Sequence, residues 1–280
     1  VVATVCGVAT SLGLGAAQIN AGLAKLFGLT VSTGMQLTII GIVALIATVS
    51  VASGLEKGIR RLSEWNMLLA AGLLLFILIV GPTVFVLDGF VQNVGYYVQH
   101  FFRLGTWSET YSGTTWQNGW TVFYWAWWIS WSPFVGMFIA RISYGRTVRE
   151  FILGVLLVPS LLTFFWMTVF GNSALHLELF GPGGIVAAVD ASVADAMFVF
   201  LEHFPLSEVS SLLAIVIVVT FFVTSADSGA MVTDIIAAGG NPERGPMQRS
   251  MWAMSLGAMA AVLLLAGGLA ALQTGAIVTG

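Results

Sequence analysis

The chain has 280 residues, of which 58% are hydrophobic and 8% are charged, and its mean hydropathy is +0.95. A soluble domain carries about 25% charged residues, so this composition predicts an all-α polytopic membrane protein. The net charge is −3, and the sequence has no basic patch of the kind that binds nucleic acid. The single cysteine, Cys6, excludes a framework of internal disulfides.

The chain begins with an apolar segment at residues 1–27, in which Gly7, Ser11 and Gly15 recur every four residues. Small residues at this spacing let membrane helices approach one another closely. We expect six further membrane helices, at residues 36–55, 66–88, 119–140, 151–170, 208–238 and 248–272. These segments are each long enough to cross the roughly 30 Å hydrocarbon core of a bilayer.

Two stretches between these spans are predicted to be something else. Residues 90–102 carry an apolar stripe at helical spacing with polar residues elsewhere, which predicts an amphipathic helix lying in the membrane interface. Residues 171–207 are predicted to be a connection that contains a short amphipathic run at 190–204.

The basic residues predict the orientation of the chain. Eight of the ten lysines and arginines lie in the loops 56–64, 141–150 and 241–249. Cytoplasmic loops carry the excess of positive charge, so residue 1 is expected at the cytoplasmic side and residue 280 outside, after seven crossings.

The segment at 119–140 has an unusual content of tryptophan, with five of the chain's ten tryptophans inside twelve residues. Tryptophan normally lies at the headgroup level, but this cluster continues into the middle of the segment. Helical spacing places four rings on one face, those of Trp127, Trp131, Phe134 and Phe138. Trp128 borders that face, and Tyr124 lies one turn before Trp128.

A cation is the expected ligand of this aromatic face. No Asp or Glu lies between Gly119 and Arg141, and each aromatic ring attracts a cation by about 0.5–2 kcal/mol. Pro133 leaves the carbonyl of Ile129 without a backbone donor, which predicts a broken helix at membrane depth of the kind found at transporter binding sites. A quaternary ammonium ion has no N–H donor that a carboxylate could accept from, so an aromatic face without acids suits it. An aromatic belt combined with helix packing is the alternative.

Residues 221–228 form a second group of interest, because Phe221, Thr224 and Ser225 lie on one helical face. Hydroxyl and carbonyl oxygens are hard ligands of the kind that bind sodium. The alternative is that these hydroxyls bond back to the preceding turn and bind nothing. In the same segment, Asp227 is a candidate proton carrier or the partner of another residue, and Asp234 is expected to be hydrated at the cytoplasmic end.

The tryptophan segment resembles the signature of the betaine/carnitine/choline transporter family. The sequence GWTVFYWAWWISWSPF at 119–134 and the sequence ARISYGRTVREF at 140–151 carry the resemblance. The stretches TSLGLGAAQINAGL and FFVTSADSGA extend it over the whole chain. The runs SADSGA, QINAGL and AALQT are more similar to the choline-uptake branch.

The resemblance implies a fold and an assembly. Family members have twelve membrane helices with a 5+5 inverted repeat, so residues 1–280 are expected to be a single transporter domain and an internal fragment. The fragment would correspond to the fifth through eleventh helices. The resemblance also implies a homotrimer in the lipid bilayer of the plasma membrane, which is the bacterial inner membrane.

The resemblance further implies a secondary active transporter that imports choline or glycine betaine by ion-coupled symport, with no cofactor other than a coupling ion. Trp127, Trp128 and Trp131 would cage the trimethylammonium group, Phe134 and Phe138 would line the inward path, and Tyr124 is a weaker candidate. Phe221, Thr224 and Ser225 would hold one sodium ion. At a second sodium site Thr4 matches the family pattern, but Val8 offers no ligand, which makes proton coupling through Asp227 the competitor.

Three alternatives to symport remain. One is a sodium-independent substrate/product antiporter of the carnitine type. A channel would need a continuous polar lumen, which the bulky aromatic segment argues against. A membrane enzyme would need a catalytic or metal-binding cluster, and His100, His176 and His203 have no ligand spacing.

Overall fold

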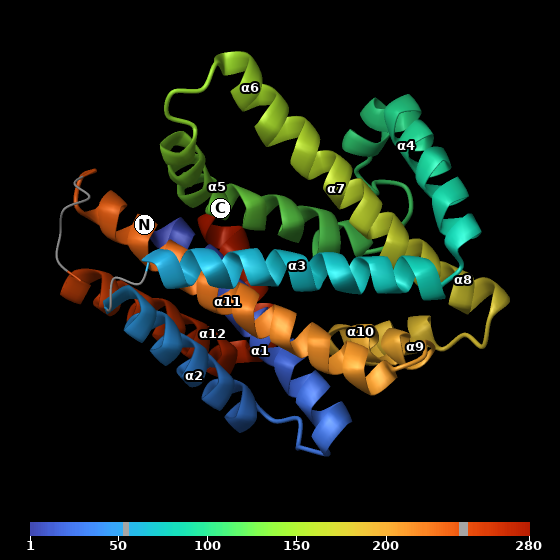
Figure 1. Ribbon diagram of the computed structural model, residues 1–280, viewed down its shortest axis with the longest axis horizontal. Coiled ribbons are helices and arrows are strands. Elements are labelled where there is room, and N and C mark those ends of the chain that lie inside the picture. The colour runs from blue at the N-terminus through green and yellow to red at the C-terminus, as the bar shows by residue number, and fades with distance from the viewer. Residues whose placement is uncertain (53–55, 241–245) are drawn as a thin grey trace. The chain divides into compact units, whose positions relative to one another are not determined.

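The computed structural model describes residues 1–52, 56–240 and 246–280, and among these residues the secondary structure is helical with no strand (Figure 1). The end of the second predicted span and most of the predicted loop 241–249 lie outside the described residues. The helices confirm the all-α class predicted from the composition.

The first half of the chain forms five long helices, with a π-helical turn before the fifth. They are α1 (Val2–Phe27), α2 (Thr33–Ala52), α3 (Glu56–Val80), α4 (Thr83–Gly105), the π turn η1 (Asn118–Val122) and α5 (Phe123–Ile142).

The second half begins with one continuous helical stretch that contains two further π turns. Its parts are α6 (Val148–Ile152), η2 (Leu153–Leu157), α7 (Val158–Met167), η3 (Thr168–Asn172) and α8 (Ser173–Phe180). The remaining helices are α9 (Ile185–Ala191), α10 (Val193–Glu202), α11 (Ser207–Ala237) and α12 (Pro246–Thr279).

Six helical stretches of the described chain are long and apolar enough to cross a membrane. They are Val2–Phe27, Thr33–Ala52, Arg61–Val80, Val148–Phe180, Ser207–Ala237 and Pro246–Thr279. The tryptophan helix α5 is not among them, because its indoles, hydroxyls and proline lower its hydropathy. Six of the seven predicted crossings therefore have suitable helices, and the crossing by α5 stays a prediction.

Three predicted spans have wrong boundaries. The span placed at 66–88 ends at Val80, because Gly81 and Pro82 stop the helix and Thr83 begins a new one. The span placed at 151–170 continues to Phe180, because the π turn η3 carries the helix through Gly171 and Asn172. The span placed at 248–272 runs from Pro246 to Thr279.

The helix α12 is broken near its last third by two glycines. Gly267 has φ −177° and ψ 24°, and Gly268 has φ 62° and ψ −142°. The second pair of angles lies in a region that is open to glycine and closed to other residues, so the GG pair permits the break.

The chain divides into two compact units, which are described separately. Unit 1 comprises Val1–Leu68, Thr115–Arg141 and Leu212–Gly280, and unit 2 comprises Leu69–Thr114 and Ile142–Ser211. All residues of the predicted substrate and ion sites lie in unit 1. The prediction of a single transporter domain is not tested by this division and stays a prediction.

Unit 1 is packed around α1, the most buried of the six apolar helices. Gly13 of α1 abuts the side chain of Leu272 in α12, and Gly15 abuts the ring of Phe222 in α11. The hydroxyl of Thr10 donates to the carbonyl of Leu272 at 2.7 Å. Small residues thus let other helices approach α1, as the glycine spacing in the sequence predicts.

Unit 2 joins α4 to the long helical stretch through aromatic and amide contacts. The rings of Phe90 and Phe165 lie 5.4 Å apart, and Asn93 donates to the side-chain oxygen of Asn172 at 3.2 Å. The carboxylate of Glu178 accepts from the backbone nitrogen of Ile185 at 2.8 Å and so caps α9. The predicted amphipathic helix 90–102 lies within α4, and its position in the membrane interface stays a prediction.

Candidate functional site

A row of aromatic side chains runs along α5 and the turn before it. We call it the aromatic row, and it consists of Trp120, Phe123, Tyr124, Trp127, Trp131 and Phe134. The ring of Phe123 stacks on that of Trp127 with centroids 5.5 Å apart and planes inclined by 13°. Trp131 meets Trp127 edge-on at 6.4 Å and Phe134 edge-on at 5.4 Å. The structure thus brings together four of the six predicted substrate residues.

The helix α5 continues through Pro133, so the predicted break is wrong. The hydroxyl of Ser132 donates to the carbonyl of Ile129 at 2.7 Å, which supplies the hydrogen bond that Pro133 cannot give. The hydroxyl of Ser130 donates to the carbonyl of Trp127 at 2.7 Å. The row is therefore carried by an uninterrupted helix whose freed carbonyl is satisfied locally.

The two indole nitrogens at the centre of the row differ in their environment. The Nε1–H of Trp127 donates to the carbonyl of Gly7 in α1 at 3.2 Å. The Nε1 atom of Trp131 is buried and has no hydrogen-bond partner among the described residues. A buried donor without an acceptor is unfavourable, and it is the kind of group that a ligand can satisfy.

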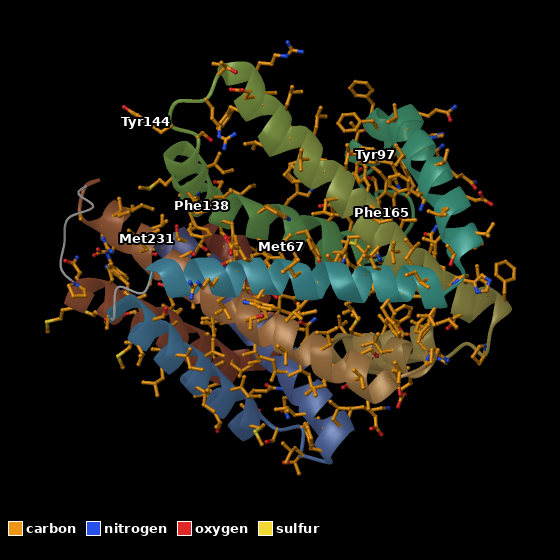
Figure 2. All side chains as sticks on the ribbon, in the orientation of Figure 1. Met67, Tyr97, Phe138, Tyr144, Phe165 and Met231 are labelled. Carbon is orange, nitrogen blue, oxygen red and sulfur yellow. The ribbon has the colours of Figure 1, made fainter. Side chains whose placement is uncertain are left out.

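Trp128 and Phe138 do not join the row. Trp128 is 65% exposed and Phe138, which Figure 2 shows on α5, is 43% exposed. Neither ring contacts another ring of the described chain. Their roles in the substrate cage and the inward path stay predictions.

The predicted sodium ligands lie on consecutive turns of α11. The hydroxyl of Thr224 donates to the carbonyl of Phe221 at 2.9 Å, and Ser225 is half-buried beside them. This bond is the back-bonded geometry of the alternative interpretation. It also places two of the three predicted oxygen ligands side by side.

Thr4 is fully buried, and its hydroxyl has no hydrogen-bond partner among the described residues. The packing of Gly15 on Phe222 and of Val8 on Gly229 shows that α1 and α11 are antiparallel. This register places Thr4 beside residue 233 of α11, which lies about 13 Å along that helix from Thr224. Thr4 and the Phe221 group are separate positions, and Val8 is engaged in packing.

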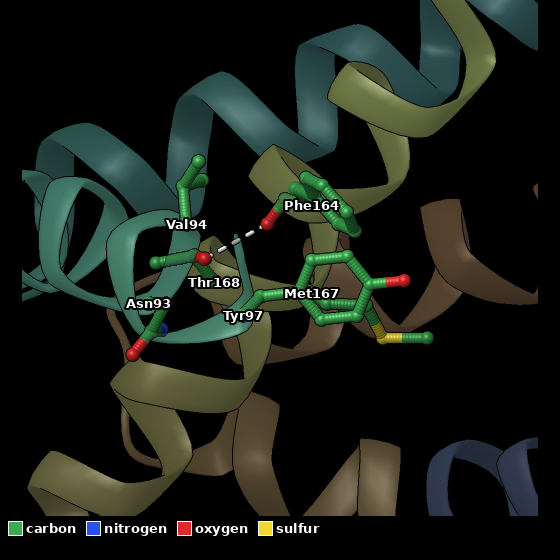
Figure 3. Close-up of a pocket in the computed structure, with 6 residues that line it drawn as sticks. All are labelled: Asn93, Val94, Tyr97, Phe164, Met167 and Thr168. Atoms are coloured by element: carbon green, nitrogen blue, oxygen red, sulfur yellow. Dashed lines mark hydrogen bonds between the residues drawn. The ribbon is translucent and has the colours of Figure 1, made fainter. Parts of the chain in front are cut away.

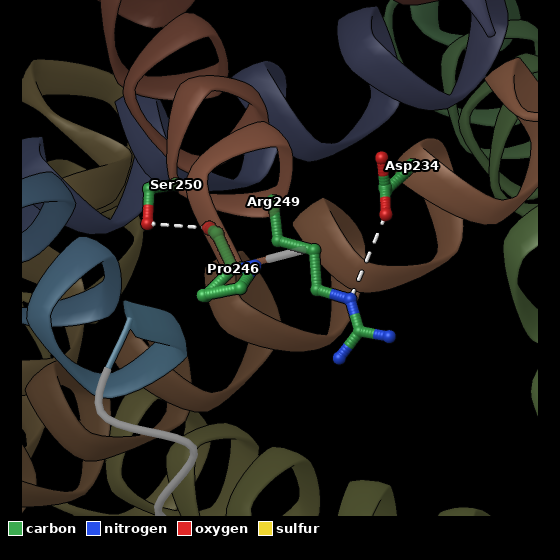
Figure 4. Close-up of polar contacts among 4 residues, drawn as sticks. All are labelled: Asp234, Pro246, Arg249 and Ser250. Carbon is green, nitrogen blue, oxygen red and sulfur yellow. Dashed lines mark hydrogen bonds and ion pairs between the residues drawn. The ribbon is translucent and has the colours of Figure 1, made fainter. Parts of the chain in front are cut away.

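Two acids of α11 are buried. Asp227 is 6% exposed and accepts a hydrogen bond from Ser50 of α2 at 3.1 Å. Asp234 is fully buried, so its predicted hydration is wrong, and its carboxylate lies 3.6 Å from Nε of Arg249 in α12 (Figure 4). No pattern in the sequence indicated Ser50, and Arg249 stood out there only as a basic loop residue.

Two cavities elsewhere hold none of the predicted site residues. One, in unit 2, has a volume of about 210 Å³ and is lined by Asn93, Val94, Tyr97, Phe164, Met167 and Thr168 (Figure 3). The other, of about 430 Å³, is an apolar groove between α2 and α12 in unit 1. No group of three or more metal-binding side chains occurs in the part of the chain that the structure describes.

Comparison with known proteins identifies the family. The family model described as "BCCT, betaine/carnitine/choline family transporter" matches residues 1–280. The chain belongs to the betaine/carnitine/choline transporter family. This membership confirms the resemblance that the tryptophan segment carries, and it places the chain in a family of transporters.

Several bacterial relatives are similar over the whole chain. A glycine betaine/proline/choline transporter of Vibrio parahaemolyticus is 47% identical over 280 residues, which are 100% of this chain and 50% of that protein. The glycine betaine transporter OpuD of Bacillus subtilis is 48% identical over 99% of this chain and 54% of its own length. An ectoine/hydroxyectoine transporter of Virgibacillus pantothenticus is 40% identical over 100% of this chain and 56% of its length.

The chain spans about half the length of the relatives it matches. Its family and its six apolar helices place it among multi-pass proteins of the plasma membrane.

Proposed function

We propose that this chain forms the cation-binding half of a secondary transporter that imports glycine betaine or choline across the plasma membrane. The aromatic row is the observation that carries the proposal, because it offers several ring faces, which attract cations, and no acid. The printed names of the Vibrio and Bacillus relatives support the same substrate class. In this proposal Trp127, Trp128 and Trp131 surround the trimethylammonium group, and assembly is as a homotrimer.

The free N–H of Trp131 favours glycine betaine as the first substrate to test. Its ring contributes a cation-binding surface, and its Nε1–H is an unsatisfied donor at the same place. Glycine betaine presents a cation and a carboxylate acceptor a few bonds apart. Choline presents the same cation but only a hydroxyl, so it would gain a weaker hydrogen bond than a charged acceptor does.

We further propose symport with one sodium ion held by the carbonyl of Phe221 and the hydroxyls of Thr224 and Ser225. The closeness of Thr224 Oγ1 to the carbonyl of Phe221 supports this assignment. The packing of Val8 against Gly229 supports a single sodium ion, because that position supplies no ligand oxygen beside Thr4. A sodium-independent antiporter of the carnitine type is the competing function.

The substitution Trp131→Leu tests the cation site. We expect it to weaken glycine betaine binding by roughly tenfold, which corresponds to the loss of about 1–2 kcal/mol from one ring. Trp131→Phe keeps a ring and removes the N–H, so we expect it to weaken betaine binding more than choline binding. The measurement is equilibrium binding and uptake of both radiolabelled substrates with the full-length protein in proteoliposomes.

Trp125→Phe is the matched control, because Trp125 lies on the same helix but is 67% exposed and outside the row. We expect it to bind both substrates with the affinity of the wild type. Unchanged affinity in Trp131→Leu would remove the aromatic row from the binding site.

A further inference from the structure

Gly7 lies where α1 crosses the aromatic row of α5. A Cβ atom at this position would lie 2.5 Å from Oγ of Ser130 and 2.7 Å from Cδ1 of Trp131. Ordinary contacts of a Cβ atom are at least 3.4 Å. The indole of Trp131 therefore rests directly against the backbone of Gly7, in space that any other residue would occupy.

The carbonyl of Gly7 makes a second contact with the row. It accepts from Nε1 of Trp127 at 3.2 Å, and it also accepts from the hydroxyl of Ser11 at 3.1 Å. One residue of α1 thus holds one indole through its carbonyl and abuts the next indole through its bare Cα. The neighbouring N–H of Trp131 has no acceptor among the described residues.

We propose that Gly7 is a positioning residue for the substrate, and this inference rests on the proposed function. Gly7 does not touch the substrate. It sets the orientation of Trp127 and Trp131 relative to each other, because its carbonyl holds Trp127 and its bare Cα gives the indole of Trp131 its place against α1. A side chain at position 7 would push Trp131 away from α1 and separate the two rings.

Other glycines distinguish this role from close packing alone. Gly13 is as tightly enclosed as Gly7, but it faces the aliphatic side chain of Leu272 in α12. A substitution at Gly13 therefore disturbs helix packing without touching the row. A Cβ atom added at Gly41 of α2 would meet no atom within 4 Å, so Gly41 serves as a neutral control.

The experiment compares Gly7→Ala, Gly13→Ala and Gly41→Ala in the full-length protein. The readouts are the affinity for radiolabelled glycine betaine, the amount bound per folded protein, and the near-ultraviolet circular dichroism of the indoles. We expect Gly7→Ala to weaken affinity about tenfold or more and to change the indole signal, with the bound amount per folded protein preserved at saturation. We expect Gly13→Ala to lower the folded yield and to keep the affinity.

Two further variants test the same contact, one alone and one in the background of Gly7→Ala. Trp127→Phe keeps the ring and removes the bond to the carbonyl of Gly7, so we expect weaker affinity in a folded protein. Ser130→Ala removes the nearer colliding atom, so we expect it to recover part of the affinity lost in Gly7→Ala.

The outcomes separate this inference from the proposed function. Full affinity in folded Gly7→Ala, or in Trp127→Phe when Gly7→Ala does not fold, would overturn the role of Gly7 alone. An equal loss of affinity in Gly13→Ala would reduce Gly7 to a packing residue. Absence of betaine binding by the wild type would overturn both.

Discussion

Asp234 and Arg249 form an ion pair in which the two partners differ in exposure. The carboxylate is fully buried, whereas the guanidinium side chain retains 28% of its exposure. Neither oxygen of Asp234 accepts a hydrogen bond within the described residues. Among these residues, the guanidinium of Arg249 is therefore the group that compensates the charge of the carboxylate. Removing one partner of a buried pair is costly because the other charge stays buried, and here that charge would be the aspartate.

The pair predicts an asymmetric response to substitution. Arg249→Met should destabilise the protein by about 3–5 kcal/mol, because it leaves a buried carboxylate without its cation. Asp234→Asn should cost less, because water can still reach the guanidinium. The measurement is the apparent unfolding temperature of the purified protein in detergent. The double variant is the control, and it should be more stable than Arg249→Met alone. A larger loss in Asp234→Asn than in Arg249→Met would contradict this view of the pair.

At the scale of the element, α5 combines a proline with a hydroxyl that compensates for it. The backbone nitrogen of residue 133 would normally donate to the carbonyl of Ile129, and the hydroxyl of Ser132 does so instead. An unsatisfied carbonyl within a membrane is unfavourable, so this bond helps to keep the aromatic row on one continuous helix.

This compensation predicts that substitutions at Ser132 and Pro133 are coupled, which a double-mutant cycle can measure. Ser132→Ala alone should destabilise the protein by about 1–3 kcal/mol, because the carbonyl of Ile129 loses its donor. In the background of Pro133→Ala, where the backbone donor is restored, the same change should be close to neutral. Ser132→Thr keeps the hydroxyl and should retain stability. Unfolding temperatures of the four proteins in detergent give the coupling, and additive effects would show that Ser132 does not act through Pro133.

At the scale of the whole molecule, the question is how the substrate gains its driving force. Glycine betaine is a zwitterion, so a membrane potential acts on it only through a coupled ion. One charge crossing about 100 mV supplies about 2.3 kcal/mol, which is roughly 50-fold in concentration. One sodium ion is therefore enough for strong accumulation.

Uptake of glycine betaine should rise with the first power of the sodium concentration. The full-length protein in proteoliposomes, with sodium and proton gradients imposed separately, provides the measurement. Thr224→Ala should remove most of the stimulation by sodium, whereas Thr224→Ser should keep it because the ligand oxygen remains. Dependence on the square of the sodium concentration would require a second site near Thr4. Uptake driven by the proton gradient alone would favour the competing carrier, Asp227.

The sequence predicted the class of fold, most of the helices and the face that carries Trp127, Trp131 and Phe134, because these depend on composition and helical spacing. The prediction from sequence was wrong where the local structure depends on side chains that lie nearby in space. Pro133 indicated a break, but the side chain of Ser132 replaces the missing donor. Asp234 was expected at a wet helix end, but Arg249 of another helix lies against it. Gly7 stood out only as a small residue, since its contact with two indoles depends on how α1 crosses α5.

The break at Gly267 and Gly268 divides α12 into two helical segments that can bend relative to each other at a hinge. An intact helix resists bending through its ladder of backbone hydrogen bonds, and two residues with non-helical angles interrupt that ladder. Beyond the hinge, the short segment is held to α1 by Thr10, and at its end Gly280 rests on the carbonyl of Ala126 in α5. A displacement of α5 would therefore be passed to this short segment. The glycine pair would let the segment rotate while the longer part of α12 moves little.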